Sequence, residues 1–187
     1  MHTVFLEGKN VILGPLSKED NLDDYAQWLN DQEVTLFMKS GRFPVNIEGL
    51  RSYIDKYNNR GDGMLLGIFL KETLKHVGNI TLHHIDWRNR HAEIGIFIGD
   101  KKARGKGNAT QAIGLMVEHA FSKLNLRKLY SGVIKGNKAS NKVFEKNGFK
   151  VEGVLREHFY LNGEYMDSYK LGLLRREYIK YSNNVST

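Results

Sequence analysis

The chain of 187 residues contains no cysteine. Disulfide bonds, thiolate metal ligands and a cysteine nucleophile are therefore excluded, and we expect no metal site. Long apolar runs are missing too, since none approaches the roughly 18 residues that a membrane span needs. The first residues, MHTVFLEGKNVIL, carry an acid and a glycine where a signal peptide would be apolar. We therefore expect a cytoplasmic protein with no membrane partner.

Neither the charge nor the apolar content of the chain is extreme. Apolar residues make up 41% and charged residues 26%, which are ordinary values for a globular protein. The length suits one domain over residues 1–187 that buries its own core. The net charge is +7, but Lys and Arg are interleaved with Asp and Glu along the whole chain. This pattern is typical of a basic solvated surface or of binding to an anionic small molecule, and we expect no nucleic-acid partner.

Alternation of apolar residues with period two predicts the strands. It is clearest in HAEIGIFIG, residues 91–99, where Ala92 and three isoleucines alternate with Glu93, glycines and a phenylalanine. Similar patterns predict further strands over residues 11–16, 64–70, 76–85, 129–134, 154–160 and 166–173. Asn162-Gly163 lies between the last two strands, and this dipeptide is a strong signal for a β-hairpin turn.

Apolar residues at helical spacing predict four helices, over residues 19–31, 47–57, 108–121 and 137–148. We expect Ser17 to cap the first helix and Asn137 to cap the last, which Gly148 would end. Mixed strands and helices predict an α/β or α+β fold. Its core would be a single mixed, mostly antiparallel sheet of about seven strands, flanked by about four helices and carrying a C-terminal β-hairpin.

The turn ARGKGNATQAI, residues 103–113, joins a predicted strand to a predicted helix. Gly105 and Gly107 allow a tight turn and let a ligand approach the backbone. The first amides of a helix have no internal partner, and its dipole favours anions at that end. Four nearby cations add positive charge: Lys101, Lys102, Arg104 and Lys106. The turn therefore predicts a phosphate site, with an ordinary turn bearing solvated cations as the alternative.

Two common phosphate motifs do not describe this turn. The phosphate loop of nucleotide hydrolases needs Gly-Lys-Ser/Thr after a four-residue spacer, which is missing here. The dinucleotide fingerprint needs a third glycine, and residue 110 is a threonine.

The run IGIFIGDKKARGKGNATQAI, residues 94–113, resembles the acetyl-coenzyme A motif of the GNAT superfamily of N-acetyltransferases. That motif, Gln/Arg-x-x-Gly-x-Gly/Ala, follows the fourth strand, and Lys102 replaces its first residue. NKASNKVFEKNGF, residues 137–149, resembles the second signature of the family, an Asn before a helix that ends in Glu-Lys-x-Gly-Phe. Residues 151–174 resemble the C-terminal hairpin of the branch with ribosomal-protein N-terminal acetyltransferases and spermidine acetyltransferases. The resemblance covers nearly the whole chain.

The resemblance implies acetyl-coenzyme A as cosubstrate, in a cleft where the strands over 91–99 and 129–134 diverge. Main-chain groups of Phe97, Ile98 and Gly99 would pair with its pantetheine arm as an added strand does. The pyrophosphate would be held by the backbone amides of Arg104, Gly105, Lys106, Gly107, Asn108, Ala109 and Thr110. The far side of the cleft would be lined by Asn137, Asn141 and Lys142.

Acetyl transfer to an amine needs a base, since an alkylamine has a pKa of about 10.4 and arrives protonated. The resemblance implies Glu93, on the face of its strand that also carries Gly95 and Phe97. A surface carboxylate paired with the neighbouring Arg90 or His91 is the alternative. His83 and His84, with Asp86, are further candidates for the base. Because adjacent strand residues face opposite ways, we expect at most one of these two histidines in the cleft.

The thiolate that leaves needs a proton donor. Many family members carry a tyrosine where this chain has Phe144, which cannot donate. This difference fits the ribosomal-protein branch, in which a serine on the same helix serves the thiolate, and Ser140 is the matching residue. An ordinary first-turn role for Ser140 is the alternative, and three tyrosines also stay open as donors: Tyr130, Tyr160 and Tyr165.

The resemblance places the acceptor against the first two helices, the loop between them and the hairpin. The acidic residues over 19–24 could attract a polyamine or a basic protein terminus, or simply form the first turn of a helix. We expect N-acetylation of a small primary amine, a polyamine or an amino sugar. The alternatives are a protein N-terminus, such as that of a ribosomal protein, and a coenzyme A-binding module without activity. Assembly into a homo-oligomer is left open.

Overall fold

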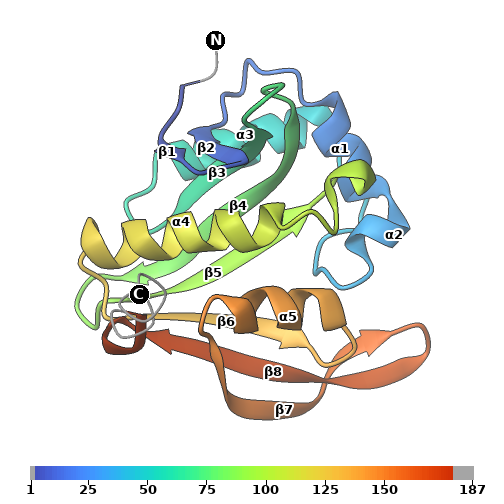
Figure 1. Ribbon diagram of the computed structural model, residues 1–187. Coiled ribbons are helices and arrows are strands. Elements are labelled where there is room, and N and C mark those ends of the chain that lie inside the picture. Colours follow the sequence, from blue (N-terminus) through green and yellow to red (C-terminus); the bar gives the residue numbers. More distant parts are fainter. Residues whose placement is uncertain (1–2, 179–187) are drawn as a thin grey trace.

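The computed structural model describes residues 3–178 (Figure 1). One eight-stranded sheet runs through them in the order β1-β2-β3-β4-β5-β6-β8-β7. Its strands are β1 (Leu6–Glu7), β2 (Val11–Pro15), β3 (Met64–Leu70), β4 (His76–Asp86), β5 (His91–Ile98), β6 (Lys128–Ile134), β7 (Lys150–Leu161) and β8 (Glu164–Leu174). Only β5 and β6 pair in parallel, and every other neighbouring pair is antiparallel. The expected mixed, mostly antiparallel sheet is confirmed, and its additional strand is the two-residue β1.

The four expected helices are present as α1 (Asp23–Asn30), α3 (Ile47–Asn58), α4 (Asn108–Ser122) and α5 (Lys138–Lys146). Two short elements were not expected, the one-turn α2 (Gln32–Thr35) and the 3₁₀ helix η1 (Lys101–Ala103). Both are too short to show helical periodicity. Residues 175–178, where the described chain ends, are helical as well.

Of the two residues predicted to cap helices, one does so and the other does not. Asn137 caps α5 by accepting a hydrogen bond from the Ser140 amide at 3.1 Å, and Gly148 follows the helix with φ of +82°. Ser17 does not cap α1, so that expectation was wrong. Its hydroxyl accepts from the Glu19 amide within a separate turn, and α1 begins only at residue 23. The spacing of apolar residues does not show where a polar turn ends and a helix begins, so it could not locate the start of α1.

Helices cover both faces of the sheet, and alternate side chains of β5 point to one face or the other. Ala92 and Ile94 are fully buried in the core beneath α4 and α5. Phe97 points to the other face, against the core that α1 and α3 form with β2 and β3. Glu93 shares the Phe97 face because side chains alternate along a strand. Within residues 3–178 we find no helix long and apolar enough to cross a membrane.

Candidate active site

The pairing of β5 with β6 stops partway along both strands. It covers three residue pairs and ends at Glu93 and Tyr130, although β5 continues to Ile98 and β6 to Ile134. Beyond this point β5 stays paired with β4 on its other side. The two strands therefore diverge, as the resemblance implied, and form a fork with Glu93 and Tyr130 at its apex. The edge of β5 inside the fork can accept an extended ligand as an added strand.

The turn after β5 favours glycine at two positions. Gly105 has φ of +74° and Gly107 has φ of +81°, a region that L-residues rarely adopt. A Cβ atom at either position would have no heavy atom within 4 Å. Glycine is therefore favoured here by the backbone angle and not by crowding, and the space over the turn is open.

Consecutive backbone amides of this turn are without a hydrogen-bond acceptor. From Gly105 to Thr110, none donates to another group among residues 3–178. The Arg104 amide differs from our expectation, because it donates to the Lys101 carbonyl at 3.3 Å. The buried Asn108 side chain holds the turn from inside by donating to the Ala103 carbonyl at 3.0 Å. Unpartnered amides at the start of α4 fit a diphosphate.

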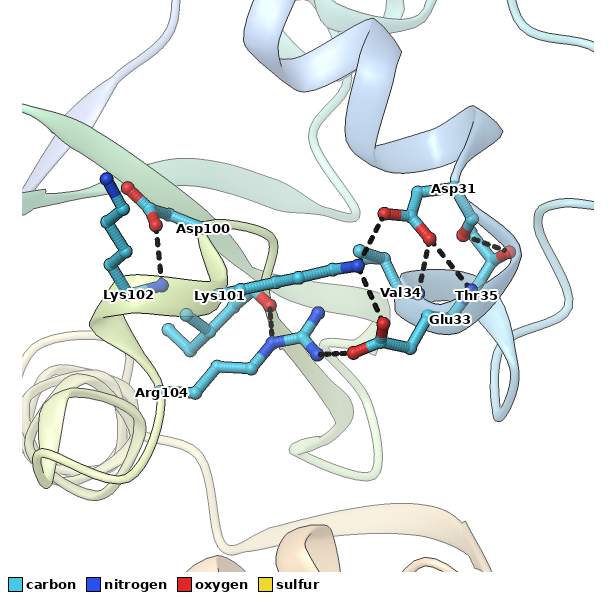
Figure 2. A network of polar contacts seen from close by, with 9 residues as sticks. Asp31, Glu33, Val34, Thr35, Asp100, Lys101, Lys102 and Arg104 are labelled. Carbon is cyan, nitrogen blue, oxygen red and sulfur yellow. Dashed lines mark hydrogen bonds and ion pairs between the residues drawn. The ribbon is translucent and has the colours of Figure 1, made fainter.

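Two of the four cations near the turn form ion pairs with the segment at α2 (Figure 2). Lys101 Nζ lies 2.7 Å from Glu33 Oε2 and 3.0 Å from Asp31 Oδ2. Arg104 Nη1 lies 3.6 Å from Glu33 Oε1, and its Nε donates to the Ile98 carbonyl at 3.1 Å. The hydrogen bond from Lys101 lowers the pKa of Asp31. Sequence reasoning missed both carboxylates, because 68 residues separate Glu33 from Lys101.

The three residues expected along the pantetheine arm are at the open end of the fork. The Phe97 ring packs 5.8 Å from Tyr25 and 6.4 Å from Trp28, centroid to centroid. The Gly99 amide donates to the Val77 carbonyl at 2.9 Å, and a Cβ atom on Gly99 would overlap the Trp28 ring. With the Ile98 carbonyl already bound by an arginine, two of the main-chain groups expected to meet the cofactor have protein partners.

The residues expected on the far side of the cleft lie on the first turns of α5. This helix follows β6 directly, so its start lies at the open end of the fork (Figure 1). Asn141 donates to the carbonyl of Asn137 at 3.0 Å, and Lys142 is exposed. Ser140 is half-buried. The two catalytic candidates therefore lie at different ends of the fork, Ser140 at the open end and Glu93 at the apex.

Glu93 lies in a group of ionisable side chains at the apex. Its neighbours in the sheet are His83 on β4 and Tyr130 on β6. His84 Nδ1 is 3.7 Å from Glu93 Oε2. Burial raises the pKa of Tyr130, and the charge of Glu93 raises it further. The alternative pairing of Glu93 with His91 is not observed, since His91 Nε2 lies 3.9 Å from Asp86 instead.

A β-bulge in β4 changes the expected direction of the histidines. The register shifts between His83 and Asp86, and His84 has φ of +49°. The bulge interrupts strand alternation, so His83 and His84 lie on one side with ring centroids 6.1 Å apart. Our expectation that at most one of them enters the cleft assumed strand alternation, which the bulge interrupts at this point.

The candidate proton donors are in different environments. Phe144 is 2% exposed and packs edge-on against Phe149 at 5.0 Å, so this position belongs to the core. Tyr160 and Tyr165 pair across the exposed tip of the hairpin, with centroids 5.1 Å apart. Of the three tyrosines left open by the sequence, Tyr130 is at the fork apex.

The loop between α2 and α3 reaches the C-terminal hairpin. Arg42 places its guanidinium 5.5 Å from the centre of the Phe159 ring on β7. Phe37 and Met166 both approach Gly136 in the turn between β6 and α5. Phe43 is 81% exposed at the same loop. The loop therefore connects the two parts of the structure that the resemblance assigns to the acceptor.

The acidic segment before α1 lies away from the apex of the fork. Glu19 and Asp20 line a hollow that also includes His76. Because His76 is seven residues from His83 along β4, the hollow is roughly 23 Å from the apex. Among residues 3–178, no cluster of three or more histidine or acidic side chains could hold a metal ion.

Comparisons with known proteins agree with this geometry. A profile described as an acetyltransferase (GNAT) domain matches residues 10–150. An uncharacterized N-acetyltransferase of Bacillus licheniformis, p20, is 32% identical over 181 residues, covering 95% of this chain and 99% of that protein. A spermidine N(1)-acetyltransferase of Escherichia coli K12 is 36% identical over 102 residues, 54% of each chain. The crystal structure of spermidine N-acetyltransferase from Vibrio cholerae in complex with CoA and spermine has a TM-score of 0.82 and 25% identity, covering 91% of this chain and 98% of that chain.

Proposed function

This chain belongs to the GNAT family of acetyltransferases, and we propose that it transfers the acetyl group of acetyl-coenzyme A to a primary amine of a small molecule, a polyamine or an amino sugar. The observation that carries the proposal is the run of unpartnered amides from Gly105 to Thr110 beside a strand fork with a carboxylate at its apex. The amides fit the pyrophosphate, and the edge of β5 inside the fork fits the pantetheine arm.

In this proposal Glu93 is the base. It is partly exposed, with a side-chain exposure of 33%, so an amine can reach it from solvent. The carboxylate attracts the ammonium form and then removes its proton, which leaves the amine lone pair free to attack the thioester carbonyl. Amides on the open edge of β5 would donate to the oxyanion that forms.

Ser140 and Tyr130 are the candidates that would donate to the departing thiolate. Ser140 follows from the resemblance and lies on the first turn of α5. Tyr130 lies at the apex, and its hydroxyl is protonated at neutral pH because the ordinary pKa of tyrosine is about 10 and burial raises the pKa of Tyr130 further. Replacing each by the residue that lacks only the hydroxyl, Ser140→Ala and Tyr130→Phe, separates the two roles.

The proposed activity is tested with purified protein, acetyl-coenzyme A and a panel of polyamines, amino sugars, aminoglycosides and basic peptides. Thiol release is followed in solution, and the acetylated product is identified by mass spectrometry. We expect turnover with small amines. Turnover with peptides alone would assign a protein N-terminus as acceptor. Tight binding of acetyl-coenzyme A with no thiol release from any acceptor would contradict the proposal and indicate a binding module.

Glu93→Gln tests the base. General-base catalysis contributes about 10²–10⁴-fold, so we expect thiol release at neutral pH to fall within that range. Affinity for coenzyme A, measured by calorimetry, should not change because the pyrophosphate turn is intact. Glu72→Gln, on the exposed turn between β3 and β4, makes the same chemical change as a control. Full turnover by the Glu93 variant would remove this residue from the base role.

A further inference from the structure

The backbone of His84 is strained at the point where its ring approaches Glu93. Its φ of +49° lies in the left-handed region, which a β-carbon disfavours. Strain of this kind persists when the surrounding structure maintains it, and it is concentrated at functional sites. Here the bulge turns His84 onto the face that already carries His83, and the His84 ring comes within 3.7 Å of the Glu93 carboxylate.

The side chains of His84 and Glu93 differ in their exposure to solvent. The Glu93 side chain is 33% exposed, whereas that of His84 is 72% exposed. A proton on the carboxylate therefore has a titratable neighbour on its solvent side. At neutral pH an imidazole can both accept and release a proton, because its ordinary pKa is about 6.5.

His83 is unsuited to this task although it pairs with Glu93 across the sheet. Its Nδ1 is hydrogen-bonded to the Tyr57 hydroxyl, and its Nε2 lies 2.6 Å from the Thr81 hydroxyl. Burial lowers the pKa of His83. Both ring nitrogens are thus occupied, and the ring stays neutral beside the carboxylate.

We propose that His84 carries the proton of the acceptor amine from Glu93 to solvent in each catalytic cycle. This inference rests on the proposed function. The N–H bond of the ammonium breaks, and the proton bonds to a carboxylate oxygen of Glu93. It then passes to Nδ1 of His84, which becomes an imidazolium and restores the carboxylate. The exposed ring releases one proton to water or buffer and is neutral again.

Several charged and titratable groups face this pair. They are His83 on β4, Tyr130 on β6, Tyr57 on α3, and Arg60 and Asp62 in the turn between α3 and β3. Arg60 and Asp62 bind each other at 2.6 Å, so their charges largely offset each other. Of the two carboxylates in this group, that of Asp62 is thus bound to an arginine, whereas that of Glu93 lies beside His84.

His84→Gly is the test. Glycine accepts the φ of residue 84, so the variant should fold at least as well as the natural protein. We expect turnover to fall at least 10-fold at pH 7, affinity for coenzyme A to stay unchanged, and added imidazole to restore most of the lost rate. Leu74→Gly is the matched control, since Leu74 has φ of +55° in the exposed turn between β3 and β4. It should change stability in the same direction without any change in turnover.

The outcomes distinguish this inference from the function on which it rests. If the natural protein acetylates no amine, the proposed function fails and the inference fails with it. If the natural protein turns over and Glu93→Gln is slow, but His84→Gly keeps the full rate, only the proton carrier is overturned. A slow His84→Gly variant that imidazole does not rescue would also overturn it, because a purely structural role predicts that result.

Discussion

At Gly105 and Gly107 the backbone angle φ favours glycine over other residue types. Both have positive φ, and neither has a neighbour that a side chain would meet. A larger residue would fit the space, but the dihedral angle would strain its backbone. The same turn carries the amides without an acceptor among residues 3–178, so the preference for glycine and the proposed anion site coincide.

Gly107→Ala should therefore affect both stability and cofactor binding. A β-carbon in the left-handed region costs about 1–2 kcal/mol, which thermal unfolding measures. Any relaxation of φ turns the first amides of α4 away from the pyrophosphate. We therefore expect the affinity for coenzyme A to fall about tenfold, which corresponds to a loss of about 1.4 kcal/mol in binding free energy. Gly61→Ala is the control, because Gly61 also lies in open space but its φ is not positive. Unchanged affinity in the Gly107 variant would contradict the assignment of the turn.

At the scale of elements, the one-turn helix α2 links the acceptor side to the cofactor turn. Asp31 caps α2 and binds Lys101, and Glu33 contacts both Lys101 and Arg104 (Figure 2). These carboxylates offset part of the positive charge that would otherwise act on an anionic ligand. They also hold η1 against α2, which precedes the loop that reaches the hairpin.

Glu33→Gln should increase the affinity for coenzyme A. The substitution leaves Lys101 with one carboxylate partner in place of two, and it removes the carboxylate partner of Arg104. More positive charge is therefore available to the pyrophosphate. We expect a several-fold lower Kd at low salt and a smaller difference at high salt, since salt screens exposed charges. Calorimetry at two ionic strengths measures both. Glu118→Gln, on the exposed face of α4, makes the same change in net charge as a control. Weaker binding would show that Glu33 acts mainly by orienting the cations.

For the whole molecule, two half-buried histidines make stability depend on pH. Burial lowers the pKa of His83 and of His119, so both rings are neutral in the fold. The unfolded chain takes up protons first as pH falls below about 6.5, and the free energy of unfolding therefore decreases. The loss is at most about 1.4 kcal/mol per pH unit for each group. Several carboxylates have lowered pKa values, and their contribution is lost only at lower pH, below about 4.

His119→Leu tests the histidine contribution without touching the fork. His119 packs edge-on against Phe5 at 5.0 Å, and its Nε2 is buried without a partner among residues 3–178. Urea denaturation at pH 7.5 and pH 5.5 should show a clear loss of stability in the natural protein and a smaller loss in the variant. Equal losses in both proteins would assign the pH dependence to other groups.

Much of the local structure of this chain could be predicted from short stretches of sequence. The amino acids around Asn137 and Gly148 predicted the cap and the end of α5, because a cap depends on residues within one helical turn. The Asn162-Gly163 turn was predicted for the same reason, and both residues have positive φ. The short elements α2 and β1 were missed because a periodic pattern needs more residues than they contain.

What the sequence by itself determined is the set of local conformations: the glycine turn before α4, the alternating face of β5 and the hairpin. Tertiary structure alone decided that the β4 bulge brings both His83 and His84 to Glu93, and that Glu33 faces Lys101. The physical reason is distance along the chain. A turn or a cap is stabilised by residues a few positions apart, whereas these ionisable groups meet only once the sheet has paired and the helices have packed on it.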